Sequence, residues 1–471
     1  MTSTELGFTP ATELARLIRT KALSPVELTR AVLERIERVN PVVNAICTLT
    51  ADAALAAARE AERAVTSGAP LGPLHGVPYT IKDLNFTKGV RTMGGSFIFE
   101  HRVPDADAAF IPRLSKAGGI FLGKTTSPEF GWKALGDSPL TGITRNPWNP
   151  GMTTGGSSAG AAAAVAAGLG PLHQGSDGAG SIRIPACFCG IYGLKPSYGR
   201  VPMWPVSNND YSSHNGPMTR TVADAALMLS VMAGPDDRDR TSLEGAPDDY
   251  VGKLKRDLKG LRVAYSPDLG AALRVDPEIA TAVRAAARAF EEMGCVVEEV
   301  KPGFTDTNET IRVMWSAHEA GIYGRFVREW RERMDPGLVA CIEDGARVSV
   351  VNYIETRDRK MAFWDSVRPL FETHALLLTP SVSVAAFEVG RLNPTGWPQH
   401  AWDWFPWASF SYPFNFTGQP AATVPAGFTA SGMPIGLQIV GRRFDDLTVL
   451  QASAAFEAAR PWARHRPPNL P

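Results

Sequence analysis

The chain has 471 residues, of which 44% are hydrophobic, so it is long enough and apolar enough to bury an extensive core. Its 48 basic residues balance 48 acidic ones, and this balance excludes a broad electrostatic footprint for nucleic acid. Glycine (44) and proline (37) are plentiful, which in so apolar a chain indicates many turns rather than disorder.

The N-terminal part is predicted to be helical. Ser24-Pro25-Val26-Glu27 has the pattern of a capping box with proline at the first helical position, and apolar residues then recur at helical spacing. Residues 51–65, rich in Ala, Glu and Arg, predict a second helix. Residues 70–200 alternate short apolar runs with Gly/Pro turns, a pattern typical of an α/β sheet.

A lysine ends the first of these apolar runs, Gly76-Val77-Pro78-Tyr79-Thr80-Ile81-Lys82-Asp83. A lysine can act as a base only when it is neutral, and burial can lower its pKa by about 3–5 units from a reference near 10.4. Lys82 is therefore a candidate base. The alternative is that Lys82 pairs with Asp83 or another carboxylate at a strand end.

The segment Gly118-Gly119-Ile120-Phe121-Leu122-Gly123-Lys124-Thr125 matches the phosphate-loop pattern of NTPases. A phosphate loop follows its strand, whereas here the apolar residues 120–122 lie inside the pattern. We expect a strand at this place, and pairing of residues 120–122 in a sheet would decide against an NTPase.

Two serine-bearing, glycine-rich segments flank a run of small residues. Gly155-Gly156-Ser157-Ser158-Ala159-Gly160 precedes residues 161–167, which predict a helix that Ser158 could cap, and Gly178-Ala179-Gly180-Ser181 follows. Serine beside backbone N–H donors supplies a nucleophile next to an oxyanion site, which acyl transfer requires. Taken alone, such sequences are also typical of flexible turns and helix caps.

The C-terminal half offers fewer chemical signals. Residues 234–257 predict a surface excursion, residues 261–265 a strand, and residues 276–293 and 308–374 helices. Nine aromatic residues crowd the segment 397–416: Trp397, Trp402, Trp404, Phe405, Trp407, Phe410, Tyr412, Phe414 and Phe416. They are either core or an apolar mouth over the active site, and the second interpretation predicts that Trp402, Trp404 and Trp407 line that mouth.

The five cysteines, at positions 47, 187, 189, 295 and 341, are interpreted as reduced thiols of a cytoplasmic protein. Charged residues throughout the first forty positions argue against a signal peptide. The longest bland apolar segment, residues 159–170, is shorter than the roughly 20 residues that span a bilayer. We therefore expect no membrane association.

The lysine segment and the two serine loops together resemble the amidase signature family, as do Arg145-Asn146-Pro147-Trp148-Asn149-Pro150 and Pro434-Ile435-Gly436-Leu437-Gln438. The resemblance implies a Ser–Ser–Lys triad in which Ser181 is the nucleophile, Ser157 relays protons after a cis peptide bond, and Lys82 is the base. It also implies an oxyanion and substrate-binding site at Gly178, Ala179, Gly180 and Ser158. One departure is Ala179, where the family usually has glycine; a positive φ there would add strain.

The resemblance implies an α/β fold, one large domain over residues 1–471 with a mixed central sheet surrounded by helices. Its signature core would span about 70–200, with a more variable helical region at about 236–376. The implied function is hydrolysis of aryl or apolar amides, with carbamates or esters as further substrates, by a monomer or homodimer that needs no cofactor and no metal. The alternative within the family is a glutamine-hydrolysing amidotransferase subunit that works with partner chains.

Overall fold

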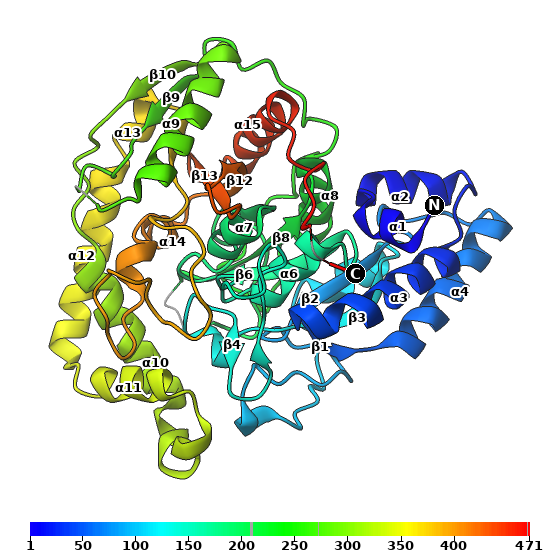
Figure 1. Ribbon diagram of the computed structural model, residues 1–471, viewed down its shortest axis with the longest axis horizontal. Helices are drawn as coiled ribbons and strands as arrows, with labels where there is room; N and C mark the ends of the chain where they lie inside the picture. The colour runs from blue at the N-terminus through cyan, green and yellow to red at the C-terminus, as the bar shows by residue number, and fades with distance from the viewer. Residues whose placement is uncertain (208–210, 272, 469) are drawn as a thin grey trace.

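A mixed β-sheet runs through the centre of the molecule in the computed structural model, which describes residues 1–207, 211–271, 273–468 and 470–471 (Figure 1). Eleven strands of this described part form the sheet, in the order β1-β3-β2-β6-β8-β7-β12-β13-β11-β9-β10. They are β1 (Ile46–Leu49), β2 (Pro78–Lys82), β3 (Ile120–Thr125), β6 (Leu172–Asp177), β7 (Tyr192–Lys195), β8 (His214–Thr219), β9 (Arg262–Tyr265), β10 (Val296–Glu299), β11 (Leu376–Pro380), β12 (Ala421–Phe428) and β13 (Pro434–Gly441). Strand β2 is parallel to β3 and β6, whereas β8 is antiparallel to both of its neighbours. The predicted mixed α/β fold is confirmed.

Helices surround the sheet. They are α1 (Ser3–Phe8), α2 (Ala11–Arg19), α3 (Pro25–Val43), α4 (Ala51–Ser67), α5 (Ile111–Lys116), α6 (Ala159–Ala167), α7 (Arg183–Cys189), α8 (Val222–Met232), α9 (Pro277–Glu292), α10 (Asn308–Trp330), α11 (Pro336–Gly345), α12 (Val350–Val367), α13 (Leu370–Thr373), α14 (Pro413–Phe416) and α15 (Asp446–Ala459). In Figure 1 the N-terminal helices α1–α4 and the segment α10–α12 lie on opposite sides of the molecule.

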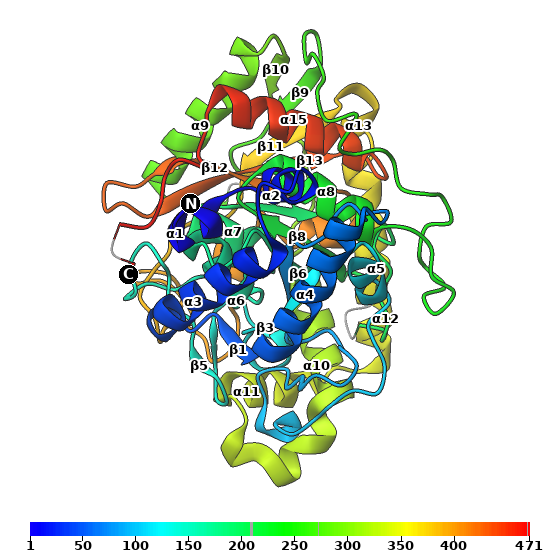
Figure 2. The same ribbon diagram turned by 90° about the vertical axis from the view of Figure 1, so that its right-hand side faces the viewer.

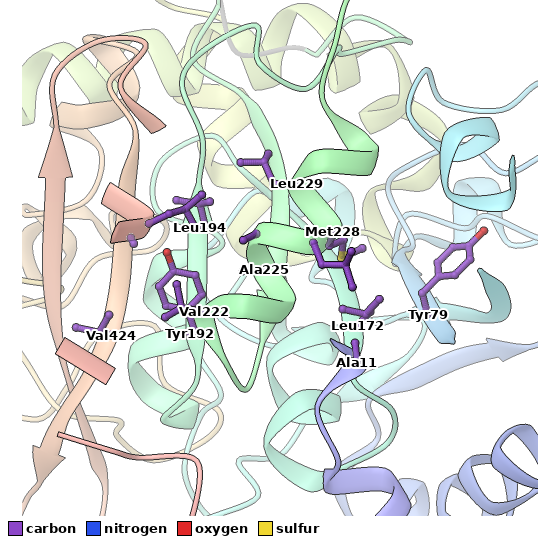
Figure 3. Close-up of a cluster of buried hydrophobic side chains, with 14 of the residues drawn as sticks. Ala11, Tyr79, Leu172, Tyr192, Leu194, Val222, Ala225, Met228, Leu229 and Val424 are labelled. Atoms are coloured by element: carbon purple, nitrogen blue, oxygen red, sulfur yellow. The ribbon is translucent and has the colours of Figure 1, made fainter. Parts of the chain in front are cut away.

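Different helices cover the two faces of the sheet. Successive residues of a strand point to opposite faces, so neighbouring residues contact different helices. Tyr192 and Leu194 of β7 pack with Val222 and other residues of α8 in the main core (Figure 3). Between them, Gly193 faces α7, and a Cβ there would lie 2.7 Å from that of Ala186. The glycine therefore lets α7, which follows the second serine loop, approach the sheet closely. In the view of Figure 2, α9 and α15 lie together at one end of the molecule, away from α10 and α11.

Helix boundaries follow the sequence signals closely. Ser24 caps α3 by accepting hydrogen bonds from the N–H groups of Val26 and Glu27. The predicted helical region 308–374 is broken before α11 and before α12. Asp335 caps α11 ahead of Pro336, whose ring disfavours a helical residue before it, and Ser349 caps α12.

The phosphate-loop pattern is a strand. Ile120–Thr125 forms β3, paired with β1 and β2, and the fully buried Lys124 binds the Asn85 carbonyl and the Thr87 hydroxyl. A backbone engaged in sheet pairing on both sides cannot cradle a phosphate, so the NTPase alternative is excluded.

Residues 234–257 form the connection between α8 and β9 and are mostly exposed or half-buried, as expected for a surface excursion. The connection contains neither helix nor strand. Within the described ranges, no helix is both long enough and apolar enough to cross a bilayer.

Candidate active site

Lys82 is the last residue of β2 and is completely buried, with 0% of its surface exposed. Its strand lies between β3 and β6, so the lysine is surrounded by backbone on both sides. The next residue, Asp83, accepts hydrogen bonds from the Met93 N–H at 3.1 and 3.2 Å. Within the described chain the Lys82 amine contacts serine hydroxyls and no carboxylate, so the alternative that it pairs with Asp83 or another carboxylate is wrong.

Three serine hydroxyls surround the Lys82 amine. Nζ lies 2.7 Å from Ser157 Oγ, 3.0 Å from Ser158 Oγ and 3.1 Å from Ser176 Oγ. Ser176 was not among the residues predicted from sequence. Its only sequence signal is its place near the end of β6, two residues before Gly178 of the second glycine-rich turn.

The hydrogen bonds of Ser158 indicate which way the protons point. The Ser158 hydroxyl donates to the Ser176 carbonyl at 3.0 Å, so toward Lys82 it acts as an acceptor. A neutral amine has two N–H bonds and one lone pair. If Lys82 donates to Ser158 and Ser176, its lone pair is directed at the proton of Ser157.

Burial lowers the pKa of Lys82 to about 7, although the charge of Asp177 acts in the opposite direction. Removing an ammonium group from water disfavours its charged form, and the three neighbours of Nζ are neutral hydroxyls. About half of the Lys82 side chains are thus neutral at pH 7.

Ser157 follows a cis peptide bond, Gly156–Ser157, as the resemblance implied. The loop is closely surrounded: a Cβ on Gly131 would lie 3.2 Å from Ser157 Oγ, and one on Gly156 would lie 2.2 Å from the Leu135 carbonyl oxygen. Ser158 occupies the N-cap position of α6, but its side chain makes no capping hydrogen bond there. It binds Lys82 and Ser176 instead, so the prediction of a capping side chain is wrong.

Ser181 stands on the second serine loop, and 5% of its surface is exposed. The Ser158 N–H donates to the Ser181 carbonyl at 3.1 Å, which joins the two loops through their backbones. Ser181 and Ser157 both line one cavity. Within the described chain the Ser181 hydroxyl makes no hydrogen bond, so Ser181 and Ser157 share a cavity without a bond between their side chains.

The backbone of the second loop holds candidate oxyanion donors. The Gly180 N–H donates to Asp177 Oδ1 at 2.7 Å and is therefore occupied. The N–H groups of Gly178, Ala179 and Ser181 form no hydrogen bond to any other described residue. Gly180 has a φ of 117°, whereas Ala179 is not among the residues with positive φ, so its extra methyl adds no backbone strain.

A buried ion pair supports this loop. Asp177 binds the Arg183 guanidinium through two oxygens at 2.9 Å, and both side chains are completely buried. Although burial opposes ionisation, the Arg183 charge holds the pKa of Asp177 well below its usual range. Because Asp177 precedes the turn that carries Ser181 and Arg183 follows it, the ion pair connects the two ends of this turn. Sequence reasoning did not identify either residue, although both adjoin the serine loop.

The cavity in front of the serines has a volume of about 450 Å³. Its aromatic lining comes from three separate segments: Phe86 and Phe99, Phe130, and the α10 region with Trp315, Tyr323 and Phe326. Phe130 and Tyr323 stack with ring centroids 3.9 Å apart.

Trp402, Trp404 and Trp407 are buried in a hydrophobic cluster and do not line this cavity. The prediction that they form the mouth is therefore wrong. The aromatic residues of the segment 397–416 are buried, apart from the half-buried Phe416. Two of the buried indoles are hydrogen-bonded there: Trp404 donates to the Trp132 carbonyl and Trp407 to the Leu392 carbonyl.

Comparison with known proteins agrees with this architecture. The sequence profile of the Amidase family matches residues 27–450. An acylamidase from Rhodococcus erythropolis is 41% identical, over 99% of this chain and 98% of its own length. One subunit of the glutamyl-tRNA(Gln) amidotransferase of Geobacter metallireducens is 35% identical, over 96% and 97% of the two chains.

Solved structures give the same result. A bacterial aryl acylamidase of the amidase signature family superposes with a TM-score of 0.90 at 32% identity, covering 97% of each chain. A 6-aminohexanoate cyclic dimer hydrolase superposes with a TM-score of 0.89 at 30% identity, covering 98% of this chain and 99% of its own. With its mixed sheet and its full-length match to these proteins, the chain belongs to the amidase signature family of hydrolases, enzymes that act on amides.

Proposed function

We propose that this hydrolase cleaves aryl or apolar amides through an acyl-enzyme, with Ser181 as nucleophile, Ser157 as proton relay and Lys82 as base. The observation that carries the proposal is the 2.7 Å hydrogen bond between Ser157 Oγ, which lines the cavity, and the completely buried Lys82 Nζ. A lysine in this environment is neutral often enough to accept a proton near pH 7.

In the acylation step Ser181 Oγ bonds to the substrate carbonyl carbon and passes its proton to Ser157, whose own proton moves to Lys82. The carbonyl oxygen becomes an oxyanion, which the N–H groups of Gly178, Ala179 and Ser181 are free to bind. The proton then returns through Ser157 to the leaving amine as the C–N bond breaks. Water repeats the sequence on the ester, which releases the acid and restores Ser181.

In this scheme Ser158 holds the lysine. Its side chain is fully buried between Lys82 and Ser176 and lies outside the cavity lining. Ser176, which does face the cavity, is the third hydroxyl that orients the amine.

The cavity supports a preference for aryl or apolar substrates. A volume of about 450 Å³ lies within the range of small-molecule pockets, and its walls are rich in phenylalanine. The similarity to an acylamidase and to an aryl acylamidase points in the same direction. Carbamates and esters present the same carbonyl to Ser181 and belong to the proposed range. The five free cysteines support a cytoplasmic location.

The proposal is tested with purified enzyme and a panel of 4-nitroacetanilide, acetamide, an aryl carbamate, an aryl ester and glutamine. Hydrolysis of the anilide by the chain alone is expected, and a phenylmethyl sulfonyl fluoride should label Ser181. Preference for glutamine, with activity only beside a partner chain, would instead support an amidotransferase subunit. Label on another residue, or full activity of Ser181→Ala, would contradict the assigned nucleophile.

A further inference from the structure

An arginine stands in the wall of the catalytic cavity. Arg102 lies on the connection between the short helix at Phe97–Phe99 and α5, and it lines the same cavity as Ser157 and Ser181. Its side chain is half-buried. Burial lowers the pKa of Arg102, but a guanidinium remains charged at any physiological pH.

Aromatic rings cover the faces of this guanidinium. Its central carbon lies 4.2 Å from the centroid of the Phe99 ring and 4.8 Å from that of Phe86. Nε donates to the Thr92 carbonyl at 2.9 Å, which fixes the plane of the group. Stacking on aromatic rings leaves the in-plane N–H edge as the direction in which Arg102 can bind.

That edge has no hydrogen-bond or ion-pair partner among the described residues. The two terminal nitrogens of Arg102 carry four N–H donors, and no hydrogen bond or ion pair joins them to any residue the structure describes. Packing against the rings accounts for the two faces of the guanidinium. The negative charge of Asp83 acts on Arg102 without forming an ion pair with it, so within the described chain the terminal nitrogens have no anion in contact. A half-buried charge of this kind is unfavourable unless something pairs with it.

The charged side chains in the described lining of the cavity are all of one sign. Arg102 and Arg325 are in its lining, and the described lining contains no aspartate or glutamate. Arg325 lies on the exposed part of α10, whereas Arg102 is held rigidly. A cation preorganised in this way, in a cavity whose described lining residues include no acidic group, is suited to an anionic part of the substrate.

We propose that Arg102 is a specificity residue that binds a carboxylate of the substrate through its two terminal nitrogens. The preferred substrates are then amides that carry a carboxylate in addition to the aryl or apolar group. This inference rests on the proposed amide hydrolysis and adds the substrate class to it. A planar carboxylate matches the exposed edge, because two parallel N–H···O bonds lie in the guanidinium plane.

The test compares matched pairs of substrates that differ only in the anion. N-(4-nitrophenyl)succinamic acid and its methyl ester place the carboxylate on the acyl side, and 4-acetamidobenzoate and its methyl ester place it on the amine side. Wild-type enzyme is expected to favour the acid of one pair by about tenfold or more in kcat/KM, in line with a charge-assisted bidentate contact.

Variants assign the effect to Arg102. Arg102→Met should remove the preference, with a loss of about 10- to 100-fold in kcat/KM for the acid, mainly through KM, and little change for the ester. Arg102→Lys, which keeps the charge but not the bidentate edge, should retain part of the preference. Arg325→Met is the matched control on the exposed arginine of the same cavity and should leave the preference in place. Thermal melting of each variant separates specificity from stability.

Equal losses for acid and ester in Arg102→Met, or no preference for the acid in either pair, would overturn the inference while leaving amide hydrolysis intact. If the wild-type enzyme hydrolyses none of the four compounds, the proposed function is overturned instead. In that case calorimetric binding of 4-acetamidobenzoate still decides the inference: weaker binding to Arg102→Met than to wild type supports the anion site, and equal binding refutes it.

Discussion

In the proposed mechanism, in which Lys82 is the base, the pH dependence of catalysis follows from the burial of this lysine. With a pKa of about 7, roughly one-tenth of the lysine is neutral at pH 6, one-half at pH 7 and nine-tenths at pH 8. Only the neutral form accepts a proton, so kcat/KM for an uncharged anilide should rise about tenfold from pH 6 to pH 8 and then level off. An unperturbed lysine, with a pKa near 10.4, would give a rise that continues to about pH 10.

The same shift links Lys82 to stability. Because its pKa in the folded state lies below the unfolded value of about 10.4, the unfolded chain binds one more proton between about pH 7 and pH 10. The free energy of unfolding therefore gains about 1.4 kcal/mol per pH unit from this residue as the pH rises through that window. Lys82→Met lacks the contribution, so its stability should improve relative to wild type as the pH falls.

Two assays check this reasoning. The first is the pH profile of 4-nitroacetanilide hydrolysis by wild type, Lys82→Met and Lys82→Arg, in which both variants should lose about 10²- to 10⁴-fold because neither side chain can accept a proton. The second is urea unfolding of wild type and Lys82→Met at pH 8 and pH 9.5. A folded Lys82→Arg enzyme with most of its turnover would show that the lysine acts only through its charge. A stability difference independent of pH would refute the lowered pKa.

Three further substitutions separate catalysis from packing. Ser157→Ala should reduce kcat by about 10²- to 10⁴-fold with little change in melting temperature, because only the relay hydroxyl is lost; activity close to wild type would remove Ser157 from the mechanism. Asp177→Asn leaves the buried Arg183 without its counterion and should lower the free energy of unfolding by about 3–5 kcal/mol in urea, and a change below about 1 kcal/mol would contradict the role of the ion pair. Trp404→Ala should destabilise the fold by about 3–5 kcal/mol and affect acetamide and bulky anilides equally, whereas a selective loss for anilides would return this residue to the substrate site.

Local features of the fold could be read from the sequence because they depend on neighbouring residues. The cap at Ser24, the strand that ends at Lys82 and the alanine-rich helix after Ser158 follow from capping, apolar patterning and helix propensity. The order of the eleven strands does not, because pairs such as β7 with β12 join segments more than 200 residues apart in the chain. The division into a signature core and a variable helical region remains a prediction.

For the candidate site, too, the residues in local motifs could be predicted from the sequence and those brought together by the fold could not. Lys82, Ser157 and Ser181 stand in recognisable segments, but the third hydroxyl around the lysine, Ser176, lies in a strand with no motif of its own. The aromatic segment 397–416 was ambiguous because density of aromatic residues does not distinguish core from cavity. The rings that line the cavity are scattered over residues 86–326, and only the tertiary structure brings them together.

The helix α6, which begins directly after Ser158, has no solvent-exposed side: all nine of its residues are buried, and a Cβ on Gly160 would lie 2.2 Å from the Ala45 carbonyl oxygen. A helix packed this closely on every side cannot unfold locally. Its amide hydrogens should therefore exchange with solvent only when the whole molecule unfolds. The first serine loop leads directly into this helix, so its amide hydrogens should be protected from exchange in the same way. On warming, catalytic geometry and global structure are then lost in one cooperative event, whereas α10, exposed along one side, is free to fluctuate earlier.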